Sequence, residues 1–316
     1  MIYKHHLKKW EDLVTTHEAT RAGFIAIAFE KNVKASPFVD EAKSLKAYAM
    51  RVKTPKDLLK MSDIYPALFT AAGLSDKSLN HLTDEDKKTA INGLIKKFLE
   101  PAGDDFVDEL VYRFLLTKGD TLGGMMKNIA GAIGEKKFIR GIISSLALKH
   151  IQFYYIPKKK AKDWIEGNYN DSTLEGNIRG LSWKNRIGHR VILLNTTPPM
   201  VKKNVDVVVL ESSHIDFNKK IIKDHTKYLA LGELKCGFDP AGADEHWKTA
   251  NTALIRIRNS FTQLGTKPMT FFIGAAIENS MAKEIYTQLK QRVLTNAANS
   301  TNENQLKSIC HWICEI

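Results

Sequence analysis

The sequence predicts an α/β protein in which a mixed β-sheet is flanked by helices and an all-helical subdomain is inserted into the core. From about residue 140 to residue 295, apolar β-branched runs alternate with amphipathic helical patterns, which is typical of an α/β core. Between residues 31 and 103, helical patterns follow one another without a strand signal. A chain of 316 residues is long for one compact core. We therefore expect a core domain of residues 1–30 and 104–316 and a helical subdomain of residues 31–103.

The first part of the chain shows helical periodicity interrupted by proline and glycine. Residues 5–29 carry apolar side chains at helical spacing. From Pro37 to Pro101, we expect short amphipathic helices that end near prolines and glycines. Residues 104–117 predict a strongly amphipathic helix that ends at Gly119, and the glycine-rich residues 119–127 would open the next one.

The second part contains five apolar runs that we expect to be strands. They cover residues 151–156, 191–194, 205–210, 228–236 and 269–277. Helical patterns cover residues 243–264 and 278–294. We expect loops at residues 179–190 and 295–304, after which residues 305–316 close the fold as a buried helix or strand.

Charge and cysteine usage limit the classes of partner and compartment. The chain has 47 Lys and Arg residues against 35 Asp and Glu residues, a formal charge of +12, which favours a polyanionic partner such as nucleic acid or an anionic membrane. No apolar run approaches the ~18 residues of a membrane span, and no secretory leader opens the chain. Cys236, Cys310 and Cys314 do not resemble a disulfide framework. We expect a cytoplasmic protein.

One apolar run carries two charges that mark a candidate site. Between Tyr228 and Cys236, only Glu233 and Lys235 are charged. Side chains alternate between the faces of a strand, so these two point the same way, roughly 6.6 Å apart. Burying charges is costly unless they are paired or bind a metal. A salt bridge at the end of a strand is the alternative interpretation of the two residues alone.

The run before it supplies a third charge. Residues 204–210 carry one carboxylate, Asp206. If the two strands pair, Asp206 and Glu233 converge on one divalent cation. Mg²⁺ prefers one or two carboxylates together with water and phosphate oxygens, and it acidifies bound water and neutralises charge on a phosphate. Lys235 would hold the attacking water or stabilise the phosphorane. This Asp…Glu-x-Lys arrangement is that of metal-dependent nucleases.

The segment that follows carries a more specific pattern. Residues 232–250 read Gly-Glu-Leu-Lys-Cys-Gly-Phe-Asp-Pro-Ala-Gly-Ala-Asp-Glu-His-Trp-Lys-Thr-Ala. This run resembles the active-site segment of the AvaI/BsoBI family of type II restriction endonucleases, in which Glu-x-Lys is followed by Gly-x-Asp-Pro-Ala-Gly-Ala-Asp-Glu-His-Trp-Lys-Thr-Ala. The likeness extends over essentially the whole chain, through residues 4–7, 20–23, 71–76, 119–124 and 310–312.

The resemblance implies roles for four residues. Asp206 and Glu233 would bind the metal, and Lys235 would position water or offset charge. His246 lies eleven residues after Lys235, in the first turn of the predicted helix, where it can return over the end of the strand. A neutral imidazole is a plausible general base near pH 7. From spacing alone, a structural histidine bonded to a carboxylate is the alternative, but the family's histidine at the matching place is regarded as the water-activating base.

The resemblance also implies a fold, a substrate and an assembly. The fold would be restriction-endonuclease-like, with residues 1–30 and 104–316 as the catalytic nuclease domain. The protein would be a Mg²⁺-dependent homodimer that cuts both strands of duplex DNA at a degenerate palindrome of the CYCGRG kind and leaves four-base 5′ overhangs. The dimer would surround the duplex, with the helical subdomain completing the ring. A palindrome mirrors a two-fold dimer.

Four further residues are candidate DNA contacts. Asp239 follows the strand directly, and a carboxylate there can accept a hydrogen bond from cytosine N4. The other three are basic: Lys127, Lys248 and Arg256.

Two other functions fit the residues without the resemblance. One is a repair or structure-specific nuclease with the same core, and the other is a non-catalytic basic DNA-binding protein whose acidic pair is only a salt bridge. Asp206 argues against the second, because a salt bridge does not require it. The chain also departs from the family at Cys236-Gly-Phe, where Gly-Gly-Ile is more usual. Because Cys236 should point away from Lys235, we expect the chemistry to be kept while the recognition contacts can differ.

Overall fold

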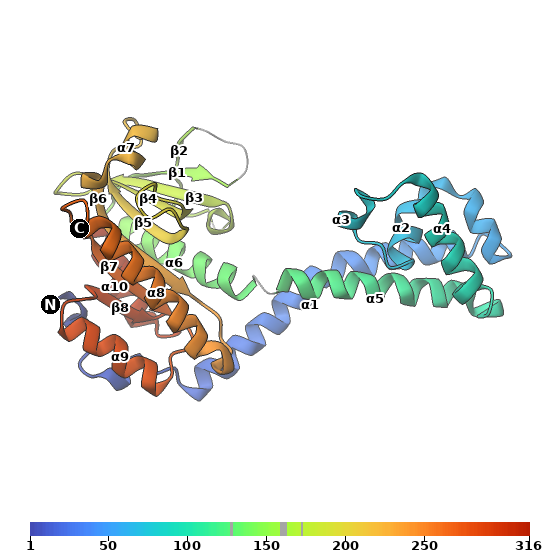
Figure 1. The fold of residues 1–316 in the computed structure, drawn as a ribbon, viewed down its shortest axis with the longest axis horizontal. Coiled ribbons are helices and arrows are strands. Elements are labelled where there is room, and N and C mark those ends of the chain that lie inside the picture. The colour runs from blue at the N-terminus through green and yellow to red at the C-terminus, as the bar shows by residue number, and fades with distance from the viewer. Residues whose placement is uncertain (127–128, 159–162, 172) are drawn as a thin grey trace. The chain divides into compact units, whose positions relative to one another are not determined.

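The computed structural model describes residues 1–126, 129–158, 163–171 and 173–316. It divides into a sheet unit, Met1–Phe24 with Ala130–Ile316, and a helical unit, Ile25–Ile129 (Figure 1). These boundaries differ from the expected helical subdomain of residues 31–103 at both ends. The largest difference arises because helix α5, Phe106–Met126, packs against helix α2, Tyr65–Ala71, and so belongs to the helical unit.

The sheet unit is built on one eight-stranded sheet with the order β2-β1-β3-β4-β5-β6-β7-β8. The strands are β1 (Phe153–Pro157), β2 (Ile165–Glu166), β3 (Ile178–Lys184), β4 (His189–Thr196), β5 (Val205–Glu211), β6 (Tyr228–Lys235), β7 (Met269–Gly274) and β8 (Asn296–Asn299). Neighbours from β2 to β6 are antiparallel, whereas β6, β7 and β8 are parallel. This confirms the predicted mixed α/β core.

Helices cover both faces of the sheet. Helices α8 (Ala243–Thr262) and α9 (Asn279–Lys290) lie on one face, and α6 (Ile129–Ala147) and α10 (Glu303–Glu315) lie on the other (Figure 1). Side chains of β5 alternate between the two cores, with Val208 under α8 and α9 and Val209 under α6 and α10. The C-terminal residues thus form a buried helix, and the thiols of Cys310 and Cys314 donate to carbonyl oxygens of α6.

Two strands lie where the sequence predicted loops. Strand β3, which begins at Ile178, covers the first part of residues 179–190, and strand β8 falls within residues 295–304. Strand β8 begins and ends with asparagine, a residue depleted in strands. Both of these side chains are buried, and Asn299 donates to the carbonyl of Leu13 and to the hydroxyl of Thr15. The polar side chain is therefore satisfied by the N-terminal segment, a partner that the local pattern cannot reveal.

Helices in the first part of the chain are longer than predicted. Helix α1, His17–Ala49, continues through Pro37, and α5 continues through Gly119. A proline removes one intrahelical hydrogen bond and bends a helix, while an interior glycine costs about 1 kcal/mol relative to alanine, so neither must end a long helix. Before α1, the chain forms two short 3-10 helices, η1 (Ile2–His5) and η2 (Trp10–Leu13), where we expected one helix.

The helical unit has a core of its own. The remaining named helices are α2 with α3 (Asp76–Leu79) and α4 (Asp84–Leu94) in this unit, and α7 (Lys219–Lys223) in the sheet unit. Leu45 of α1, Leu68 of α2, Leu94 of α4 and Phe114 of α5 belong to one buried apolar cluster. Within the described ranges, no helix combines the length and the apolar composition needed to cross a bilayer.

Burial along α8 generates a stability prediction with a matched control. Ile257 is fully buried under the sheet, whereas Ile255 on the same helix is 45% exposed. We expect Ile257→Ala to lower the free energy of unfolding by about 2–5 kcal/mol through lost burial and a cavity. Ile255→Ala should change it by no more than about 0.5 kcal/mol.

Urea unfolding followed by tryptophan fluorescence measures this difference in the sheet unit alone. All five tryptophans lie in that unit: Trp10, Trp164, Trp183, Trp247 and Trp312. Equal losses for the two variants would contradict the packing of α8 described above.

Candidate active site

The pairing of β5 with β6 brings two carboxylates together. Val207 lies opposite Gly232 in this antiparallel pair, so the next position places Asp206 opposite Glu233. Directly opposed side chains have Cβ atoms about 4.5–5.5 Å apart. The Asp206 carboxylate also accepts a hydrogen bond from the backbone N–H of Leu234, with Oδ2 2.9 Å from the nitrogen. Asp206 is thereby held by its own side chain to the neighbouring strand.

Lys235 completes a charged cluster with these two acids. Its Nζ lies 2.8 Å from Asp206 Oδ2 and 2.8 Å from Glu233 Oε2. Glu233 and Lys235 share one face of β6, which is the face of Leu231 under α8 and α9. The structure thus brings the three residues together on two neighbouring strands, as the spacing predicted, and we call Asp206, Glu233 and Lys235 the charged cluster.

Burial controls the protonation of the charged cluster. The side chain of Glu233 is only 4% exposed, and those of Asp206 and Lys235 are about one-fifth exposed. Burial is the largest cause that raises the pKa of Glu233 above its usual range, and the negative charge of Asp206 is the second largest. For Lys235, burial lowers the pKa, but attraction to Asp206 and Glu233 outweighs it, and the pKa is raised overall. One ammonium therefore faces two carboxylates, and the cluster favours a further positive charge.

The charged cluster also has an oxygen available for a cation. Glu233 Oε1 is buried, and among the described residues it has no hydrogen-bond partner. A buried acceptor left in this state costs roughly 1–3 kcal/mol. Across the described part of the chain, no three His, Cys, Asp or Glu side chains come together as ligands. Two carboxylates with an open oxygen match Mg²⁺, which uses one or two carboxylates and completes its shell with water and phosphate oxygens.

His246 lies beside the chain that leaves β6. It belongs to the first turns of α8, which follows the short 3-10 helix η9, Pro240–Gly242. Its half-buried imidazole lies against Gly237, two residues after Lys235, so closely that a Cβ at Gly237 would be 2.5 Å from Cε1. No hydrogen bond joins His246 to a carboxylate within the described ranges. The contact thus places the imidazole against the chain two residues after Lys235, and among the described residues its ring nitrogens have no hydrogen-bond partner.

Asp239 and Lys248 both have local partners near the start of α8. Asp239 is exposed, and its Oδ1 accepts a hydrogen bond from the N–H of Ala241 at 3.0 Å, which caps η9. Lys248 is exposed on α8 and forms an ion pair with Asp244 at 2.5 Å. An exposed ion pair of this kind contributes little to stability, so Lys248 can exchange Asp244 for another anionic partner.

The other two predicted DNA contacts are not brought to the cluster. Arg256 lies ten residues beyond His246 on α8, roughly 15 Å further along the helix axis. The helix runs away from the end of β6 that carries Lys235, so Arg256 is remote from the cluster. Lys127 lies outside the residues that the structure describes.

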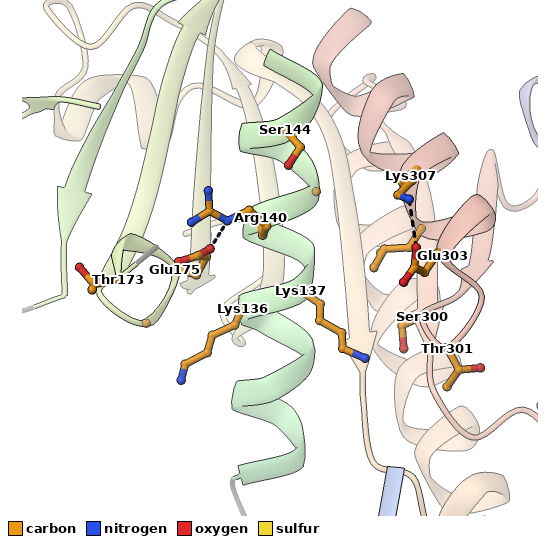
Figure 2. A pocket seen from close by; sticks show the side chains of 13 residues that line it. Lys136, Lys137, Arg140, Ser144, Thr173, Glu175, Ser300, Thr301, Glu303 and Lys307 are labelled. Carbon is orange, nitrogen blue, oxygen red and sulfur yellow. Dashed lines mark hydrogen bonds and ion pairs between the residues drawn. The ribbon is translucent and has the colours of Figure 1, made fainter. Parts of the chain in front are cut away.

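Sequence reasoning missed the contribution of α6. Cys236 points into the face covered by α6, opposite to the face of Lys235, and its side chain fills the space over Gly134. A cavity lies next to this contact, lined by residues of α6, by the loop around Glu175 and by the segment from Ser300 into α10 (Figure 2). In the sequence, the only signal was Lys136-Lys137 in an amphipathic helix, which cannot be distinguished from solvated surface.

The comparisons with known proteins agree over the entire chain. Residues 3–316 match the family model of restriction endonuclease BsobI. The chain is 49% identical to the type II restriction enzyme AvaI of Nostoc sp., over 100% of both chains. It is 50% identical to the type II restriction enzyme BsoBI of Geobacillus stearothermophilus, over 99% of this chain and 98% of the relative. The chain therefore belongs to the BsobI family of restriction endonucleases, type II restriction enzymes of the AvaI and BsoBI kind.

Proposed function

We propose that this protein is a Mg²⁺-dependent type II restriction endonuclease that hydrolyses one phosphodiester bond in each strand of duplex DNA. The observation that carries the proposal is the charged cluster, in which two opposed carboxylates share one ammonium and one of them has a buried oxygen without a partner among the described residues. Membership of the family supports the same reaction class. A purely structural salt bridge between Glu233 and Lys235 would need neither Asp206 nor a free oxygen on Glu233.

Each residue of the site has a chemical role in this proposal. Asp206 and Glu233 would hold Mg²⁺, which when bound supplies positive charge to the phosphate and acidifies water. Lys235 lies against both carboxylates, where its ammonium offsets negative charge that develops on phosphorus. His246 accepts the proton of the attacking water. The water oxygen then forms the new bond to phosphorus, the phosphodiester P–O bond breaks, and the leaving oxygen takes up a proton from solvent, to which His246 later releases the proton that it accepted.

We infer the specificity and the assembly from the resemblance to the family. The protein would act in the cytoplasm as a homodimer that surrounds DNA, recognises a palindrome of the CYCGRG kind and leaves four-base 5′ overhangs. Two-fold symmetry relates a palindrome to a dimer, which supports this part physically. Exposed Asp239 would accept from cytosine N4, while Lys127, Lys248 and Arg256 would contact DNA elsewhere.

Digestion of a plasmid of known sequence tests the function directly. With Mg²⁺, we expect discrete fragments whose ends map inside CYCGRG sites with four-base 5′ overhangs, and with EDTA the plasmid should stay intact. Sequencing of the fragment ends measures both properties. Discrete fragments with ends at another motif would support a restriction endonuclease but contradict the proposed recognition sequence. An uncut plasmid that binds the protein would contradict the proposed nuclease activity.

Removal of either carboxylate tests the metal ligands. Asp206→Asn and Glu233→Gln keep the side-chain shape but remove the charge, and a metal ion contributes several kcal/mol to such a reaction, so cleavage should slow by at least about 10³-fold. Binding of duplex DNA should persist, because less negative charge then faces the phosphate. Glu211→Gln is the matched control, since Glu211 ends the same strand β5 but is exposed and pairs with Lys227. Cleavage by Glu233→Gln at the normal rate would refute the assignment.

Substitutions at His246 and at Gly237, which it contacts, test whether His246 is the general base. His246→Ala should reduce the single-turnover cleavage rate by about 10²–10⁴-fold. Gly237→Ala should also reduce it, because the new methyl group displaces the imidazole. Gly242→Ala is the control, since its Cβ would lie 3.7 Å from the same ring, an ordinary contact. A normal rate for His246→Ala, with enzyme in excess over DNA, would show that another group accepts the proton.

A further inference from the structure

A basic cavity of about 610 Å³ lies on the α6 and α10 face of the sheet. Three segments far apart in the sequence form it: α6, the short 3-10 helix η7 (Leu174–Gly176), and the chain from Ser300 into α10. Figure 2 shows Lys137 extending from α6 toward Ser300 and Thr301, with Lys307 and Glu303 on α10. None of these residues belongs to the charged cluster or to the sites that the sequence predicted.

Of the four basic side chains that line the cavity, two form ion pairs with its acidic residues. Arg140 forms an ion pair with Glu175 and donates to the carbonyls of Tyr169 and Asp171, so it is committed to holding η7 on α6. Lys307 pairs with Glu303 at 3.0 Å. Lys136 and Lys137 are exposed, and neither has an ion-pair partner among the residues that the structure describes.

The backbone connects this cavity to the charged cluster. The carbonyl of Lys235 accepts from the N–H of Ala275 at 2.9 Å, and the carbonyl of Gly274 accepts from the N–H of Ser300 at 2.7 Å. Lys235 and Ser300 therefore lie at the same ends of three parallel strands, β6, β7 and β8. Their backbones are two strand spacings apart, roughly 10 Å, and they share one edge of the sheet, with the side chain of Lys235 on the α8 and α9 face and the cavity on the α6 and α10 face.

The buried thiol between the two regions supports this proximity. Burial is the main cause that raises the pKa of Cys236 to about 12. A hydrogen bond with Ser300 lowers this pKa, the charge of Asp206 raises it, and the charges of Lys137 and Lys235 lower it, all by smaller amounts. Cys236 thus lies within electrostatic reach of the charged cluster on one side and of the cavity on the other. A phosphodiester strand that crosses this edge of the sheet from the cluster can therefore reach Lys137.

We propose that the cavity binds the sugar–phosphate backbone of DNA next to the cleaved bond, with Lys136 and Lys137 neutralising two phosphates. This inference rests on the proposed function and deepens it. Contacts to phosphate carry no base information, so the cavity positions the strand and does not select the sequence. The aliphatic part of Lys136 already lies against Gly176, 3.4 Å from the position of a Cβ there, which leaves its ammonium at the rim of the cavity.

The test is the salt dependence of DNA binding, measured in EDTA so that no strand is cut. Each neutralised phosphate contributes about 0.9 to the slope of log affinity against log salt, so Lys136→Ala with Lys137→Ala should reduce the slope by about 1.8 for each protomer bound, or about 3.6 for the homodimer. The reduction should be equal for a duplex with a CYCGRG site and for one without it. Lys136→Arg with Lys137→Arg keeps both positive charges and should retain the slope of the wild type.

Lys219→Ala with Lys220→Ala is the matched control. These two lysines are exposed on α7, between the end of β5 and the start of β6, so they lie at the opposite end of the sheet. The control should keep the wild-type slope. Tryptophan fluorescence checks that every variant is folded, and since Lys136 and Lys137 are exposed we expect no loss of stability.

The outcomes separate this inference from the proposed function. A wild-type slope for the double alanine variant, an equal loss for the α7 control, or a loss confined to the duplex with the site would overturn the backbone-binding role while the wild type still cuts DNA. Failure of the wild type to bind or cut DNA would overturn the proposed function and this inference with it.

Discussion

The register between β5 and β6 is the constraint on which the charged cluster depends. Both faces of this part of the sheet are covered by helices, and β5 contains three consecutive buried valines, so apolar alternation alone distinguishes poorly between neighbouring registers. The polar contacts of Asp206 do distinguish them. A slip of one residue would separate Asp206 from the N–H of Leu234 and turn Glu233 into the other apolar core. The chemistry of the site and the pairing of the strands are therefore specified by the same side chains.

Much of the candidate site could be predicted from the sequence because its chemistry is local. Glu233 and Lys235 are two residues apart on one strand, so strand geometry alone places them on one face. Asp206 and His246 lie on the neighbouring strand and on the helix after β6, and connections between consecutive elements are usually short. The mixed sheet and its flanking helices followed from periodicity in the same way. The pattern could not predict that Oε1 of Glu233 is buried without a hydrogen-bond partner in the part of the chain that the structure describes, because this depends on how tightly the surrounding core is packed.

The unpredicted parts depend on contacts between distant segments. The buried asparagines of β8 lack strand propensity, and Asn299 is satisfied by Leu13 and Thr15, almost 300 residues earlier. Helix α1 passes through Pro37, a break by local rules alone. The basic cavity combines α6, η7 and α10, and no window of the sequence contains all three. Local rules describe propensity and pairing of neighbours, whereas these features are decided by tertiary packing.

The contact between Gly134 and Cys236 has a consequence for how this chain can diversify. A Cβ at position 134 would lie 2.1 Å from both Cβ and Sγ of Cys236, so a side chain at 134 and a thiol at 236 exclude each other. The two positions are therefore epistatic, although about 100 residues separate them. A chain that carried glycine at 236 would have room for a larger residue at position 134 of α6. Once that residue is acquired, cysteine at 236 would require a return to glycine at 134, so the order of the two substitutions matters.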